Sequence, residues 1–144
     1  MSEIRIEDLS VRYGATDALR GLRLRVPARA ILGVIGPARS GKTTFLRVLN
    51  RLAQEVDGAQ VTGRVVFDDG EDLLTGPPRA LRRRVGMVFA TPQVLPGSVR
   101  WNLCYGPRLH GLRGAPLRRR MEEALVAARL FEEVKDRLDD AAAR

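Results

Sequence analysis

The stretch from residue 30 to residue 50 constrains the fold more than any other part of the chain. An apolar run over residues 31–35 precedes a loop, and apolar residues at helical spacing follow it. The loop reads Gly36-Pro37-Ala38-Arg39-Ser40-Gly41-Lys42-Thr43-Thr44. It fits the phosphate-binding pattern G-x-x-x-x-G-K-[ST] at every fixed position, in the strand, loop and helix order that the pattern requires. We therefore expect an α/β fold in which this loop leaves a buried strand and enters a helix.

The spacing of the loop residues suits the binding of a phosphate chain. Main-chain N–H groups must point inward to surround phosphate oxygens, and side chains at Gly36 and Gly41 would obstruct them. The helix that begins near Lys42 directs its free N–H groups and positive dipole end to the same place. Lys42 can reach the β- and γ-phosphates of a nucleotide, and the Thr43 hydroxyl can bind Mg²⁺. The sequence thus predicts a nucleotide site with ATP and Mg²⁺ as ligands.

Composition limits the other functional classes. The chain has 144 residues and a formal net charge of +8, part of which comes from arginine triplets at 82–84 and 118–120. Few aromatic residues lie near either triplet, so we interpret both as solvated faces and expect no nucleic-acid partner. Cys104 is the only cysteine, and we expect neither a disulfide nor a catalytic thiol. The chain has no signal-peptide core and no run of about 20 apolar residues, which favours a cytosolic location.

Hydrophobic periodicity predicts the order of the elements. Residues 4–13 and 22–26 alternate as half-buried strands, whereas the continuous apolar runs 31–35 and 85–89 indicate two buried parallel strands. Residues 61–69 form another expected strand that ends in an Asp-Gly turn, and an irregular loop follows over residues 91–97. We expect a helix that begins near residue 42 and ends near residues 57–58, further helices over residues 79–84, 98–104, 117–128 and 131–138, and a Gly/Pro-rich connection over residues 105–116. Residues 1–97 would be the nucleotide-binding core and residues 98–144 a helical subdomain.

The order of these features resembles the nucleotide-binding subunit of ATP-binding-cassette (ABC) transporters. Tyr13 is similar to the aromatic residue that stacks on adenine in that family, and the helical section resembles the part that faces the membrane permease. Four segments look most like the ATPase subunit of inorganic-phosphate importers: residues 45–51, 81–89, 105–111 and 134–138. The resemblance implies a P-loop NTPase core with a small helical subdomain. It also implies a dimer that hydrolyses ATP against transmembrane permease subunits, at the cytoplasmic face of the membrane.

Two residues near the site depart from the family pattern. Ala90 stands at the position of the family's glutamine and cannot bind Mg²⁺ or orient a water molecule. Gln93 lies three residues further on. We hypothesise that Gln93 takes the place of the family's glutamine as a metal ligand. Arg39 stands where the family often has glycine, and its side chain could point outward or lie over the phosphates.

The family's signature motif, Walker B aspartate, catalytic glutamate and switch histidine would all follow a position like Leu138. Residues 65–69 look like a Walker B strand, but we interpret them as a strand that ends in a turn. We therefore assign no catalytic residue, and we expect an incomplete ABC ATPase domain that grips nucleotide without the groups that cleave it. The alternatives are a non-hydrolysing nucleotide-binding module that acts through partner subunits, or a small P-loop kinase whose lid would need the arginines at 118–120.

Overall fold

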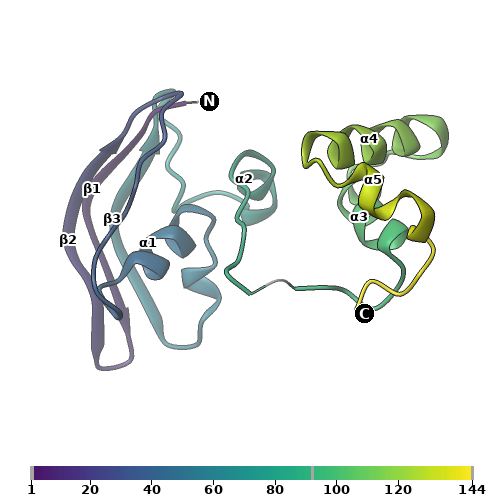
Figure 1. Ribbon diagram of the computed structural model, residues 1–144. Helices are drawn as coiled ribbons and strands as arrows, with labels where there is room; N and C mark the ends of the chain where they lie inside the picture. Colours follow the sequence, from purple (N-terminus) through teal and green to yellow (C-terminus); the bar gives the residue numbers. More distant parts are fainter. Residues whose placement is uncertain (1, 92, 144) are drawn as a thin grey trace. The chain divides into compact units, whose positions relative to one another are not determined.

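The computed structural model describes residues 2–91 and 93–143, and Pro92, in the expected loop over residues 91–97, lies outside them. The chain divides into two compact units, residues 1–88 and residues 89–144 (Figure 1). The expected functional division after residue 97 stays a prediction. No described helix combines the length and the apolarity that crossing a bilayer would require.

The first unit is built on an antiparallel sheet in the order β2-β1-β3. These strands are β1 (Ile4–Tyr13), β2 (Thr16–Val26) and β3 (Ala59–Phe67). β1 pairs with β2 from Ile4 opposite Val26 to Tyr13 opposite Thr16, so a tight turn joins the two strands. The expected strand over residues 22–26 is confirmed, but it begins earlier, at Thr16. The pairing of β1 with β3 shifts where Asp8 has a φ of 51°. Gly63 faces this irregularity, and a Cβ there would lie 2.6 Å from the Asp8 carbonyl oxygen.

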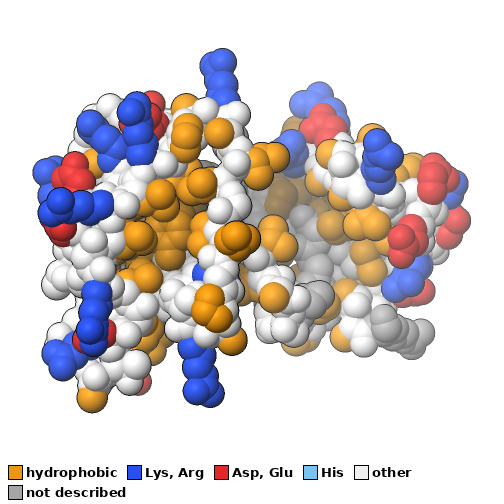
Figure 2. Space-filling view, turned by 60° about the vertical axis from the view of Figure 1, so that its left-hand side comes forward, with side chains coloured by type: hydrophobic (Ala, Val, Ile, Leu, Met, Phe, Trp, Pro, Cys, Tyr) orange, Lys and Arg blue, Asp and Glu red, His pale blue; other side chains and the backbone are white. Residues whose placement is uncertain are grey.

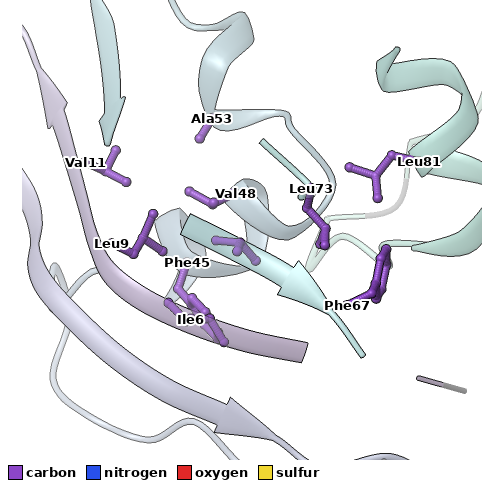
Figure 3. Close-up of a cluster of buried hydrophobic side chains, with 10 residues drawn as sticks. Ile6, Leu9, Val11, Phe45, Val48, Ala53, Phe67, Leu73 and Leu81 are labelled. Atoms are coloured by element: carbon purple, nitrogen blue, oxygen red, sulfur yellow. The ribbon is translucent and has the colours of Figure 1, made fainter. Parts of the chain in front are cut away.

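Helix α1 (Lys42–Leu49) lies against one face of this sheet (Figure 1). Its Phe45 and Val48 enter a core that also holds Ile6, Leu9 and Val11 of β1 (Figure 3). A short 3-10 turn, η1 (Ala53–Glu55), and helix α2 (Pro78–Arg84) complete the unit. The apolar spacing of residues 42–52 therefore predicted a helix correctly, and the helix ends earlier than expected because Asn50 and Arg51 leave the helical conformation.

Two arginines of the first triplet attach α2 to the rest of the first unit. Arg82 donates to the carbonyl oxygens of Asn50 and Arg51 and pairs with Glu55 at 2.8 Å. The Arg84 guanidinium lies 3.9 Å from the centre of the Phe67 ring and pairs with Asp69 and Glu71. These two arginines are held by the protein's own carboxylates and carbonyl groups. The absence of a nucleic-acid partner stays a prediction.

The predicted turn after residues 65–67 is confirmed. β3 ends at Phe67, and the Asp69 carboxylate accepts a hydrogen bond from the Glu71 main-chain N–H at 3.0 Å. This bond, together with the Arg84 guanidinium, lowers the pKa of Asp69 below its ordinary value. The carboxylate is therefore occupied in a local turn and is not a Walker B group.

The two expected parallel strands are absent from the structure. Residues 31–35 and 85–89 have no strand conformation, and Ile31, Ile35 and Val88 are almost fully exposed at 103%, 95% and 97%. A strand forms only where another segment satisfies its N–H and C=O groups, and no described residue pairs with either run. Figure 2 shows hydrophobic side chains gathered on the open face of the first unit, with basic side chains around them.

The second unit is helical. It contains α3 (Val99–Leu109), α4 (Gly114–Ala127), α5 (Phe131–Val134) and the 3-10 turn η2 (Lys135–Arg137). The buried centre is formed by Cys104, Leu117, Met121 and Leu125. α3 continues through Pro107 to Leu109, so part of the expected connection over residues 105–116 is helical. Arg100 binds Asp139 through two hydrogen bonds of 2.7 and 2.9 Å, which attaches α3 to the C-terminal segment.

The core packing predicts a contrast between two leucines of the first unit. Leu9 has no exposed surface, whereas Leu46 on α1 is 46% exposed. We expect Leu9→Ala to lower the free energy of unfolding by about 2–5 kcal/mol because it leaves a cavity in the core. Leu46→Ala should cost less than about 1 kcal/mol. Urea denaturation followed by circular dichroism measures both, and equal losses would contradict the assignment of Leu9 to the core.

Candidate functional site

The predicted phosphate loop lies against the start of β2, at Ala18 and Leu19. Gly41 caps α1 with a φ of 87°, and a Cβ at this position would lie 2.5 Å from the Ala18 carbonyl oxygen and 2.6 Å from Leu19. Real Cβ atoms do not approach backbone so closely, so only glycine fits here. The sequence predicted that the loop needs glycine at position 41 so that its backbone can come close to a ligand. The structure adds a second reason, because the backbone of Gly41 also lies close to β2.

Lys42 folds back onto the loop that precedes it. Its ammonium nitrogen donates to the carbonyl oxygens of Gly36 at 2.9 Å and Pro37 at 2.6 Å, and to the Ser40 hydroxyl at 3.1 Å. The Ser40 N–H also points to the Pro37 carbonyl at 3.4 Å, which closes a turn. The ammonium group therefore sits inside the curve of the loop, where the sequence predicted a positive charge.

A pocket of about 290 Å³ opens beside the loop and the start of α1. It is lined by Thr16, Asp17, Ala18, Arg39, Ser40, Gly41, Lys42, Thr43 and Thr44. The first N–H groups of a helix have no partner within the helix, so those of α1 are available to an anion at this pocket. The volume lies just below the range for ligand pockets, about 300–1,000 Å³, which suits the phosphate tail of a nucleotide with its sugar and base outside.

The structure brings together most of the predicted site residues. Arg39, Ser40, Gly41, Lys42, Thr43 and Thr44 line the pocket, while Gly36 and Pro37 hold the Lys42 ammonium group. Ala38 lies in the exposed part of the same loop. Ala90 and Gln93 belong to the second unit, and the role of Gln93 as a metal ligand stays a prediction.

Tyr13 lies at the end of β1, opposite Thr16 of β2. Its ring packs against the core, and its hydroxyl oxygen is buried without a hydrogen-bond partner among the described residues. Tyr13 therefore lies close to the pocket through its neighbour Thr16 but does not line it. The stacking of adenine on this ring stays a prediction.

Sequence reasoning missed Thr16 and Asp17, because it treated residues 14–17 only as a turn. The Asp17 carboxylate lies 2.9 Å from the guanidinium of Arg20 and 3.6 Å from that of Arg12. These two arginines offset its negative charge, which would otherwise oppose the entry of an anion. No local sequence signal could have placed Thr16 and Asp17 at the pocket, since their position there depends on the docking of the loop against β2.

The fold and the pocket define a P-loop nucleotide-binding domain. The sequence profile of the family described as "ABC transporter" matches residues 19–144. The chain therefore belongs to the ABC transporter family and carries part of its nucleotide-binding domain. ATP is the ligand of such domains, typically with Mg²⁺.

A solved structure of a bacterial Atm1-family ABC exporter with ATP bound has a similar fold. The TM-score is 0.79 at 22% sequence identity, and the match covers 97% of this chain. It covers 23% of the exporter chain, so the present chain spans about a quarter of that protein's length. At this identity the likeness concerns the fold. The family match and this likeness together confirm the predicted fold class, and the antiparallel β section with helices fits part of a P-loop NTPase domain.

The close approach of Gly41 to β2 predicts the effect of a methyl group there. Gly41→Ala should lower the free energy of unfolding by more than about 1 kcal/mol and weaken phosphate binding, because the loop must move away from Ala18. Gly14→Ala is the matched control, since Gly14 also has a positive φ of 55° but has open space around its Cβ position. Thermal denaturation compares the two variants. A loss at Gly41 no larger than that at Gly14 would contradict the close contact.

Arg39 adopts a backbone conformation that usually belongs to glycine, with a φ of 64°. This conformation costs a non-glycine residue about 1 kcal/mol or more. We expect Arg39→Gly to raise the free energy of unfolding by about 0.5–1 kcal/mol, since part of the relief is offset by the greater freedom of glycine in the unfolded chain. Urea denaturation provides the measurement, and a destabilised variant would show that the arginine side chain supports the fold.

Proposed function

We propose that residues 36–44 bind the phosphate tail of ATP and that the assembled protein couples ATP binding and hydrolysis to transport across a membrane. The observation that supports this most directly is the pocket of about 290 Å³ in which the loop, the start of α1 and the Lys42 ammonium group converge. Each of these three features attracts anions for a different physical reason, and together they suit a chain of phosphates.

Binding would proceed by the chain's own groups in the following way. The free N–H groups at the start of α1 donate to the inner phosphates, and the helix dipole favours their negative charge. Lys42 already lies within the curve of the loop and supplies a positive charge to the β- and γ-phosphates. Tyr13, close to the pocket through Thr16, would then offer its ring to the base.

Mg²⁺ fits the chemistry of the residues present. Thr43 is exposed at the first turn of α1 and lines the pocket, so its hydroxyl could provide one oxygen ligand. Phosphate oxygens and water molecules supply the others in sites of this kind, because Mg²⁺ retains several waters. No cluster of three or more His, Cys, Asp or Glu residues that could hold a metal occurs in the described segments, so a dedicated protein cage is not expected there. Gln93 remains a second proposed ligand.

The partners proposed for this function are a second ATPase copy, which would form a dimer, and transmembrane permease subunits at the cytoplasmic face of the membrane. Import of inorganic phosphate is the finer proposal. It rests on the resemblance of residues 45–51, 81–89, 105–111 and 134–138 to the ATPase subunit of phosphate importers. The likeness to an exporter fold at 22% identity carries no argument about the direction of transport.

A second candidate function is a module that binds ATP without hydrolysing it and acts through partner subunits. Ala90 favours this candidate, because a methyl side chain at the family's glutamine position can neither bind the metal nor orient a water molecule. Phosphoryl transfer requires both a positioned nucleophile and stabilisation of the developing charge. The two candidates share the nucleotide site and differ only in turnover.

Lys42→Ala tests the shared site. We expect the affinity for MgATP to fall at least tenfold, because the variant removes a charge that forms strong hydrogen bonds with phosphate. Lys135 is the other lysine of the chain and lies in the second unit, paired with Glu132, so Lys135→Ala is the matched control. Isothermal titration calorimetry measures both variants, and circular dichroism monitors their folding. Unchanged affinity in a folded Lys42→Ala sample would refute the site.

Phosphate release from MgATP, measured on the same samples, separates the two candidates. Sustained release that Lys42→Ala abolishes would exclude the non-hydrolysing module. Tight binding without release would instead favour the module for this chain.

A further inference from the structure

Arg39 differs in its backbone from the other non-glycine residues that line the pocket. It lies in the exposed part of the loop and lines the pocket beside Lys42, with a φ of 64°. Arg51 and Arg129 share this region of φ, but they follow the ends of α1 and α4, where such a conformation is common. Arg39 stands at no helix end, so its strained backbone has no such structural origin.

The two cations of the pocket are bound very differently. Lys42 has three N–H donors, and three acceptors of the loop already take them: the Gly36 and Pro37 carbonyl oxygens and the Ser40 hydroxyl. Lys42 must give up at least one of these bonds before it can donate to a phosphate. In residues 2–91 and 93–143, by contrast, Arg39 makes no hydrogen bond and no ion pair. Its five donors can therefore bind a ligand without losing an existing partner.

Asp17 is the only carboxylate among the described residues that line the pocket, and it does not pair with Arg39. Its oxygens lie 2.9 Å from Arg20 and 3.6 Å from Arg12, so their positive charges offset the carboxylate. The charge of Arg39 is thus uncompensated within the pocket. Other arginines of the first unit contrast with this arrangement, since Arg82 and Arg84 are both held by carboxylates.

We propose that Arg39 binds the terminal phosphate of the nucleotide and gives the site a preference for triphosphate over diphosphate. This inference rests on the proposed function, because it assumes that residues 36–44 hold the phosphate tail. It assigns to Arg39 a role in specificity that the loop pattern does not require, since Arg39 occupies one of the variable positions of G-x-x-x-x-G-K-[ST].

The position of Arg39 favours the outermost phosphate. The N–H groups at the start of α1 lie where the loop meets the helix, and they suit the inner phosphates. Arg39 lies in the exposed part of the loop, so the planar guanidinium can donate two parallel hydrogen bonds to a phosphate that extends beyond the helix start. ATP carries one more phosphate and a greater negative charge than ADP, and an uncompensated cation stabilises the more highly charged tail by the larger amount.

The test measures the affinities of the full chain for MgATP and MgADP by calorimetry at low ionic strength, where an exposed charge is least screened. Arg39→Gly removes the side chain and relieves the backbone, so weaker binding by this variant would not come from loss of stability. Arg39→Gln keeps a Cβ and the strained backbone but removes the charge. We expect both variants to bind ATP about tenfold more weakly and ADP less than twofold more weakly.

Arg47→Gln is the matched control. Arg47 is exposed in the last turn of α1 and does not line the pocket, so the substitution removes the same charge at the far end of the helix that follows the loop. Its ratio of ATP to ADP affinity should equal that of the unmodified chain. The proposal is overturned if the Arg39 variants keep the original ratio of ATP to ADP affinity, whether both affinities are unchanged or both fall by the same factor. It is also overturned if only Arg39→Gly changes this ratio.

Lys42→Ala, measured in the same series, distinguishes the failure of this inference from the failure of the proposed function. If Lys42→Ala weakens both nucleotides while the Arg39 variants keep the original ratio, the loop is a nucleotide site and only the role of Arg39 is wrong. If Lys42→Ala leaves both affinities unchanged, the nucleotide site itself is refuted, and the assignment of Arg39 to a terminal phosphate falls with it.

Discussion

The contact between Gly41 and the backbone of β2 is the interaction on which the rest of the site depends. A hydrogen in place of a Cβ lets the loop reach the Ala18 carbonyl oxygen and lets α1 begin at Lys42. α1 then directs Phe45 and Val48 into the core beneath the sheet (Figure 3). The site is consequently positioned by buried packing on one side, while residues 31–40 are exposed. An exposed loop can hold a defined pocket because its end is fixed to a rigid element.

The formal net charge is +8, and several of the arginines that contribute to it are bound by other groups of the protein. Arg82 binds carbonyl groups at the end of α1, and Arg84 covers the ring of Phe67. Arg100 likewise joins α3 to Asp139. These groups stabilise local structure and leave little of their charge for a polyanionic partner. A positive charge acts most strongly on a ligand where the protein has not already compensated it, and among the described residues that line the pocket Arg39 carries such a charge.

The sequence predicted what depends on local chemistry and failed where pairing between distant segments decides. The loop pattern, the hairpin, the Asp-Gly turn after β3 and the amphipathic face of α1 all follow from residues close in the chain. Residues 31–35 and 85–89 have the composition of buried strands, but composition does not supply the partner that a strand needs. The sequence did not predict Thr16 and Asp17 as pocket residues for a similar reason, since only the docking of the loop against β2 brings them to the pocket.

The exposed run over residues 31–35 leaves Lys42 with a second role. A buried strand would hold the start of the loop, but here that start is held by the bonds from the Lys42 ammonium group to Gly36 and Pro37. The same group therefore maintains the curve of the loop and attracts the ligand, and each phosphate contact that it makes is offset in part by a bond that it gives up. The net gain from Lys42 is thus a difference between two sets of hydrogen bonds. A cation with no internal partner contributes without that offset, so residues near the lysine of the loop pattern can determine how strongly the loop distinguishes one phosphate chain from another.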